Sequence, residues 1–220
     1  MTKKVILTIA VVWCFATSSL AADLTRITLP PPDTKGGKPL MQCLSERRTN
    51  RSISPKKLPM AIISSLLWAA CGINRPDSGK RTAPGAHNWQ EVEAYVAMEE
   101  GLYRYNAKAH VLEPVLDRDL RAETTIFIQP SRRLVANAPV QLIYVADYSK
   151  FSFGMDNESK LLYSSADTGF IAQNVYLYCA SAGLATVVRG YVEREKLAEA
   201  MKLNSDQKVV LVQTVGYPKE

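Results

Sequence analysis

The sequence predicts an α+β domain in which helices cover a small antiparallel or mixed sheet. Apolar residues recur at helical spacing in several segments, and alternating segments typical of strands lie between them. Hydrophobic residues make up 47% of the 220-residue chain and charged residues 22%, as in ordinary soluble domains. This composition excludes a disordered chain, a collagen-like repeat and a multi-pass membrane protein.

The first 22 residues have the three parts of a secretory signal peptide. A basic start with Lys3 and Lys4 precedes an apolar run from Val5 to Ala16, and small residues follow up to Ala22. The run is shorter than the ~20 residues that span a bilayer, so we expect cleavage and no membrane span afterwards. The expected location is periplasmic or secreted. Cleavage removes two of the lysines behind the net charge of +6, which argues against a nucleic-acid partner.

The N-terminal part of the mature chain should be an arm followed by two helices. Residues 23–37 contain a proline triplet and a glycine pair, which predict an extended arm. Helices are expected over residues 39–48 and 57–71, with Gly72 as the C-terminal cap of the second. Residues 73–88 form a long predicted loop, and a loop of this length in a compact domain is usually functional or disordered.

Alternating residues predict strands on both sides of a turn at Glu100 and Gly101. The first strand covers residues 92–98, and further strands at 102–105 and 110–112 make a hairpin or meander. Residues 117–126 should form a short helix, and residues 139–145 a buried strand.

The longest helix is predicted over residues 167–182, with apolar side chains nearly all round it. Such a helix lies in a core or between subunits. A short strand at 185–188, a polar helix at 193–203 and a strand at 209–215 complete the chain.

The cysteines and histidines limit the possible chemistry. Cys43, Cys71 and Cys179 remain after cleavage without a CxxC spacing, which leaves one disulfide with one thiol, or three buried thiols. His87 and His110 are the only histidines and show no ligand spacing. We therefore expect neither a metal site nor a Ser-His-Asp triad.

A basic segment at the end of the first predicted helix is the strongest phosphate signal. Arg47, Arg48, Thr49 and Arg51 place three guanidinium groups and a hydroxyl within five residues. Guanidinium forks suit bidentate phosphate binding and also stabilise negative charge on a ring carbonyl. Alone, such a cluster is more often a solvated face. Neither a P-loop nor a glycine-rich dinucleotide motif is present.

Two further segments strengthen this signal: Pro84-Gly85-Ala86-His87-Asn88-Trp89-Gln90 and Leu184-Ala185-Thr186-Val187-Val188-Arg189-Gly190. In this order and at these separations, the three segments resemble the nitroreductase-like flavoprotein family over roughly residues 39–219. Residues 45–52 and 81–95 look closest to the branch that contains the SagB-type dehydrogenases. Residues 169–174 and 215–218 add to the resemblance, which makes residues 38–220 a nitroreductase-like FMN-binding domain.

The resemblance implies an FMN-dependent homodimer, with a flavin at the subunit interface and a long central helix in that interface. Arg47, Arg48 and Thr49 resemble the ligands of the phosphate and ribityl chain. Arg51 resembles the basic group near the pyrimidine end of the ring, where a cation stabilises the reduced flavin.

Two other segments are expected around the flavin. Residues of the first resemble the partner subunit's segment along the cofactor: Pro84, Gly85, Ala86, His87 and Asn88. Val188, Arg189 and Gly190 resemble the loop whose backbone amides face the flavin N5 edge.

The sequence also departs from the family pattern. Gly85 stands where the family usually has serine, and residues 89–91 differ from the common Ser/Thr-Gln-Pro. Arg189 occupies a position that is often acidic or small. The chain ends at Lys219-Glu220, without the basic tail that helps many members to hold the phosphate.

The favoured hypothesis is an exported FMN-dependent oxidoreductase that reduces nitro, quinone-like or other small electrophilic organics. Its electron donor is open: a nicotinamide, a quinol or a redox protein. A SagB-like dehydrogenase that oxidises a peptide-derived substrate is the second hypothesis. The third is a non-catalytic binding protein that kept the fold.

Overall fold

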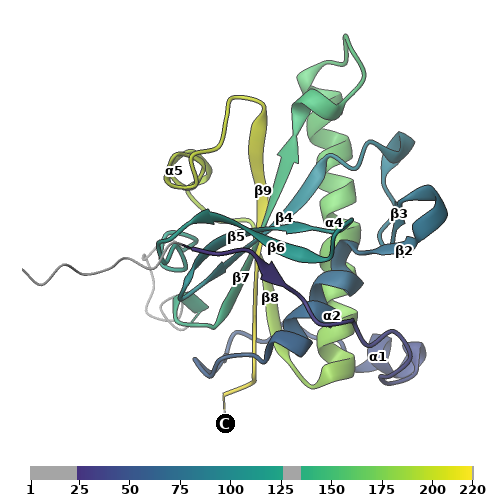
Figure 1. Cartoon of the computed structure of the whole chain (residues 1–220), viewed down its shortest axis with the longest axis vertical. Coiled ribbons are helices and arrows are strands. Elements are labelled where there is room, and N and C mark those ends of the chain that lie inside the picture. Colours follow the sequence, from purple (N-terminus) through teal and green to yellow (C-terminus); the bar gives the residue numbers. More distant parts are fainter. Residues whose placement is uncertain (1–23, 126–134, 220) are drawn as a thin grey trace, which may run out of the picture.

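The computed structural model describes residues 24–125 and 135–219 (Figure 1). Seven strands form one sheet in the order β1-β6-β5-β4-β7-β9-β8, and every pair of neighbours is antiparallel. This confirms the α+β class and its antiparallel sheet. The strands are β1 (Ile27–Thr28), β4 (Val92–Met98), β5 (Gly101–Asn106), β6 (Val111–Leu116), β7 (Val140–Asp147), β8 (Ala185–Arg189) and β9 (Gln207–Gly216).

Helices lie on both faces of the sheet (Figure 1). On one face α2 (Met60–Cys71) and α4 (Asn157–Ala182) pack together, with α1 (Leu40–Glu46) against α4. Alternate residues of β4, from Val92 to Met98, join Leu66 and Val175 of these helices in the main core. The residues between them, Tyr95 and Ala97, face the other side and share a second core with α5 (Arg194–Ala200). Both faces of β4 are therefore buried, each in a different core.

The second helix begins at Met60, later than predicted, because Pro59 occupies its N-cap position. Gly72 is the C-terminal cap, as predicted, and its amide donates to the Trp68 carbonyl at 2.8 Å. Its φ of −69° and ψ of 165° are extended, not left-handed. A Cβ on Gly72 would lie 2.6 Å from the Cα of Trp68. Glycine is therefore needed for close backbone approach rather than for a positive φ.

The longest helix begins at Asn157 and not at residue 167, so its first turns were missed. Asp156 caps it, because its carboxylate accepts a hydrogen bond from the Ser159 amide at 2.8 Å. The first four residues after this cap, 157–160, are polar and do not show the apolar spacing that predicts a helix. The last predicted helix is real but shorter than expected, since α5 ends at Ala200.

The predicted helix at 117–126 is wrong for the described residues 117–125, which form turns and bends. The Asp119 carboxylate accepts from the Arg121 amide at 2.9 Å, and the Thr124 hydroxyl donates to the Arg121 carbonyl at 2.7 Å. Such local bonds compete with helical hydrogen bonding. Ile126 lies outside the described residues.

Residues 73–88 are not the unstructured loop that was predicted. They hold a small hairpin of β2 (Ile73–Arg75) and β3 (Lys80–Arg81), with the 3-10 turn η1 (Pro76–Ser78) between its strands. A second 3-10 turn, η2 (Ala86–Asn88), follows. The segment is ordered by its own backbone pairing.

The arm contributes the edge strand β1, so its described part is more than a linker. The predicted signal peptide lies outside the described residues. None of the described helices combines the length and apolarity that crossing a membrane requires. Cys43, Cys71 and Cys179 are all buried and unpaired, which matches the three-thiol alternative.

Candidate cofactor-binding site

The basic segment directly follows α1 and lies beside β8. The Asn50 amide donates to the Thr186 carbonyl at 3.0 Å, which fixes the segment against the sheet. Arg47 and Arg48 line a cavity of about 520 Å³, together with residues from the C-terminal half of α4. The arginines are thus held at a concave surface and not on a flat solvated face.

The charges in this cavity suit an anion. Lys38 and Glu46 pair with each other at 2.6 Å, whereas Arg47 and Arg48 form no ion pair within residues 24–125 and 135–219. The Arg47 guanidinium lies 5.4 Å from the centre of the Tyr176 ring, which orients it. Two free guanidinium forks fit the phosphate of FMN.

Tyr176 links two of the predicted segments. Its hydroxyl bonds the Thr49 hydroxyl at 3.0 Å and accepts the Val188 amide, also at 3.0 Å. Tyr176 is not among the residues that the sequence predicts for the site. Its role as a bridge depends on contacts between distant segments, which no local pattern shows.

The predicted loop at residues 188–190 is partly wrong, because Val188 and Arg189 belong to strand β8 and only Gly190 lies beyond it. The Val188 amide is already bonded to Tyr176. The Arg189 side chain donates to the Thr124 carbonyl at 2.6 Å and to Gln141 Oε1 at 2.8 Å. It therefore braces the sheet against residues 124–125.

The segment from Pro84 to Asn88 has a strained backbone. His87, Asn88 and Gln90 all have positive φ, at 48°, 56° and 50°. Non-glycine residues in this region persist only where the surroundings hold them, and they cluster at functional sites. One such restraint is Asp167 of α4, whose carboxylate accepts the Ala86 amide at 3.1 Å. Most of the segment is exposed: Pro84, Gly85, His87 and Asn88.

Within one chain, this segment does not meet the arginine cavity. The cavity beside Pro84 is lined by Asp167 and Ile171, near the middle of α4, whereas the arginine cavity reaches Ala180 and Gly183 at its end. Asp167 and Ala180 lie about 20 Å apart along the helix at 1.5 Å per residue. A site with both segments requires a second subunit, as the family resemblance implies.

The cavity beside Pro84 has a volume of about 420 Å³ and contains an unusual acid. Glu91 is 1% exposed, and neither of its carboxylate oxygens has a hydrogen-bond partner in the described part of the chain. Burial, together with a smaller effect of the nearby charge of Asp167, raises the pKa of Glu91 to about 7. Neither Glu91 nor Asp167 was predicted as a site residue. The one signal for Glu91 in the sequence is its place directly before the predicted apolar strand at 92–98.

We expect Glu91→Gln to change how stability depends on pH. Folded Glu91 keeps its proton up to a pKa of about 7, whereas the unfolded chain releases it near its ordinary value. Its contribution to the free energy of unfolding is thus complete below about pH 4.5 and is lost as the pH rises to 7, by up to about 3 kcal/mol. Glutamine does not ionise, so the variant should lack this loss.

Urea unfolding of both proteins at pH 4.5 and pH 8 measures the difference. Glu113→Gln is the control, because hydrogen bonds from Asn106 and Arg104 lower the pKa of Glu113, so its effect on stability is lost mainly below pH 4.5 and the variant should change between the two pH values much as the wild type does. Equal pH dependence of the wild type and Glu91→Gln would contradict a protonated, buried Glu91.

Two proteins are similar to this chain in sequence. A crystal structure from Ralstonia eutropha JMP134, titled as a nitroreductase, is 41% identical, with a TM-score of 0.81 over 89% of this chain and 90% of that one. A Methanocaldococcus jannaschii protein with a nitroreductase name is 29% identical over 74% of this chain and 84% of its own length.

The E. coli microcin synthetase McbBCD complex, solved with truncated pro-MccB17, shares the fold. One of its chains has a TM-score of 0.68 at 20% identity, over 77% of this chain and 68% of that one. Residues 44–217 match the family described as the nitroreductase family. The chain therefore belongs to the nitroreductase family.

Proposed function

We propose that the protein is an exported FMN-dependent oxidoreductase acting on nitro, quinone-like or other small electrophilic organic molecules. Membership of the nitroreductase family supports an oxidoreductase. The arginine cavity is the observation that supports FMN as the cofactor: Arg47 and Arg48 line a space of about 520 Å³ and form no ion pair with any described residue. The expected signal peptide supports export.

In this proposal the side chains bind FMN and tune its reduction potential, and FMN supplies the hydride or electron transfer when bound. Arg47 and Arg48 hold the phosphate, with Thr49 near the ribityl chain. Arg51 is exposed after the same segment and supplies positive charge at the pyrimidine end of the ring. The Pro84–Asn88 segment of the partner subunit closes the site, and Gly190 lies at its edge.

The outer face of α4 supports the homodimer. Leu162 and Phe170 are 67% and 47% exposed there. Ala166, Gly169 and Gln173 share this face, because residues three or four apart are neighbours on a helix. Large apolar side chains beside two small residues suit close packing against a second copy of the helix. The predicted interface helix thus has a surface for that role.

The test uses single-turnover reduction, which does not require the natural donor. The purified protein, loaded with FMN and reduced anaerobically with dithionite, is mixed with nitrobenzene or with a benzoquinone. Reoxidation should accelerate with substrate concentration and exceed that of free reduced FMN. Protein that takes up no FMN would favour the non-catalytic alternative, and bound flavin that neither compound reoxidises would contradict the substrate class.

A further inference from the structure

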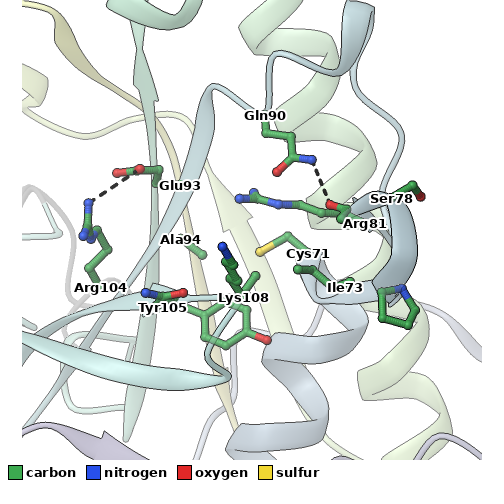
Figure 2. A pocket seen from close by; sticks show the side chains of 14 residues that line it. Cys71, Ile73, Ser78, Arg81, Gln90, Glu93, Ala94, Arg104, Tyr105 and Lys108 are labelled. Atoms are coloured by element: carbon green, nitrogen blue, oxygen red, sulfur yellow. Dashed lines mark hydrogen bonds and ion pairs between the residues drawn. The ribbon is translucent and has the colours of Figure 1, made fainter.

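A cavity of about 600 Å³ lies between the β2–β3 hairpin and strands β4 and β5. Figure 2 shows Arg81 extending from the hairpin into this space, with Lys108 and Arg104 on its other side. It adjoins the cavity beside Pro84, because Cys71, Arg81 and Gln90 line both cavities. We name it the Arg81 cavity. Its size is ordinary for a small-molecule site.

The lining of the Arg81 cavity carries excess positive charge. Its acid, Glu93, lies 2.8 Å from Lys150 and 3.7 Å from Arg104, so its charge is already neutralised. Arg104 also pairs with Glu113 at 2.7 Å. Arg81 and Lys108 form no ion pair within the described ranges. An anionic ligand would balance these two cations.

Arg81 is held in place with unused hydrogen-bonding capacity. Its Nη1 donates to the Val92 carbonyl at 3.2 Å, and its carbonyl accepts Arg75 Nη2 at 2.8 Å. Its Nε is fully buried and has no partner among the described residues. A buried donor without a partner is uncommon and calls for an explanation. A carboxylate in the cavity would accept from the Nη groups of the guanidinium, of which only Nη1 has a partner among the described residues.

We propose that the Arg81 cavity binds a small organic monocarboxylate, with the carboxylate on the Arg81 guanidinium. An arginine fork matches the two oxygens of a carboxylate. Inorganic phosphate has no apolar part and would make no use of the rest of the lining. Ile73, Ala94 and Tyr105 supply apolar surface for the body of the ligand.

The site lies within one chain and does not involve Arg47 or Arg48, so it does not depend on FMN or on the proposed function. The lining shared with the cavity beside Pro84 leads from Arg81 past Gln90 toward Pro84 and Asn88. A ligand anchored at Arg81 can therefore extend toward the segment expected beside the flavin. If the proposed function holds, the preferred electrophiles are carboxylated ones.

Calorimetric titration of the full protein with benzoate tests the proposal, with benzamide as the neutral molecule of the same shape. Benzoate should bind about tenfold or more tightly than benzamide, because only benzoate forms a charge-assisted hydrogen bond with Arg81 through a carboxylate. Arg81→Gln should remove this preference, and Arg118→Gln, an exposed arginine paired with Glu123, should keep it. Inorganic phosphate should bind more weakly than benzoate.

Two further variants keep the test decisive. Lys108 is exposed, so Lys108→Glu leaves the packing intact and should weaken benzoate binding several-fold even if Arg81→Gln fails to fold. The double variant Arg47→Ala/Arg48→Ala should bind benzoate normally. Equal affinities for benzoate and benzamide, benzoate binding that survives Arg81→Gln, or its loss in the double variant would each overturn the proposal.

Discussion

Gly169→Phe is expected to convert the proposed dimer into a monomer and to abolish the proposed FMN binding. Gly169 lies on the exposed face of α4, and a Cβ built there meets no atom within 4 Å. One subunit therefore has room for the larger side chain, and replacing a mid-helix glycine favours the helix. The phenylalanine would instead block close approach of a second α4. Because the proposed site needs two subunits, the flavin should leave with the partner.

Light scattering at micromolar concentration and the flavin absorbance of the purified variant measure both effects. Glu195→Phe places the same side chain on exposed α5, on the opposite face of the sheet, and should stay dimeric with its FMN (Figure 1). A dimeric Gly169→Phe with full FMN content would show that α4 does not form the interface.

Replacing both arginines of the cavity, Arg47→Ala/Arg48→Ala, should weaken FMN binding by about a hundredfold or more. Each charge-assisted hydrogen bond to a phosphate contributes about 1.5–3 kcal/mol, which is tenfold or more in affinity. Neither guanidinium has an acidic partner among the described residues, so its removal leaves no carboxylate unpaired. Titration of FMN into apoprotein measures the dissociation constant.

Arg118→Ala is the matched control, because Arg118 pairs with Glu123 and lines neither the arginine cavity nor the cavity beside Pro84. It should bind FMN like the wild type. A double variant with the wild-type dissociation constant would remove Arg47 and Arg48 from the phosphate site.

Local periodicity was enough to predict most of the sheet and the existence of the main helices. Residues 92–98 were predicted as a strand from the apolar residues at every second position, and these residues all pack in the main core, while Tyr95 and Ala97 pack in the second core. The start of α4 was missed because a side-chain cap at Asp156, and not apolar spacing, begins the helix. The segment 117–125 was misassigned because side-chain bonds from Asp119 and Thr124 stabilise turns there.

The candidate site was predictable only where its chemistry is contiguous in the chain. Arg47 and Arg48 are neighbours in sequence and share one cavity. Glu91, directly before β4, lies near Asp167 of α4, and the Tyr176 hydroxyl joins Thr49 to Val188. These contacts exist only after the sheet and the helices have packed, so no sequence spacing indicates them.

The central claim is that one subunit supplies the arginine cavity and its partner supplies the Pro84–Asn88 segment. A heterodimer tests it, formed by co-expressing Arg47→Ala/Arg48→Ala with His87→Asp/Asn88→Asp and isolated through two different tags. Aspartate tolerates the positive φ of both loop positions and adds negative charge that should repel FMN.

The measurement is the FMN content of this heterodimer beside both variant homodimers. A shared site predicts one intact and one doubly altered site per heterodimer, hence about half of the wild-type FMN content in a two-fold dimer. Each variant homodimer should retain almost none. A heterodimer as empty as the two homodimers would contradict the account, because a site built within one chain is damaged in both subunits.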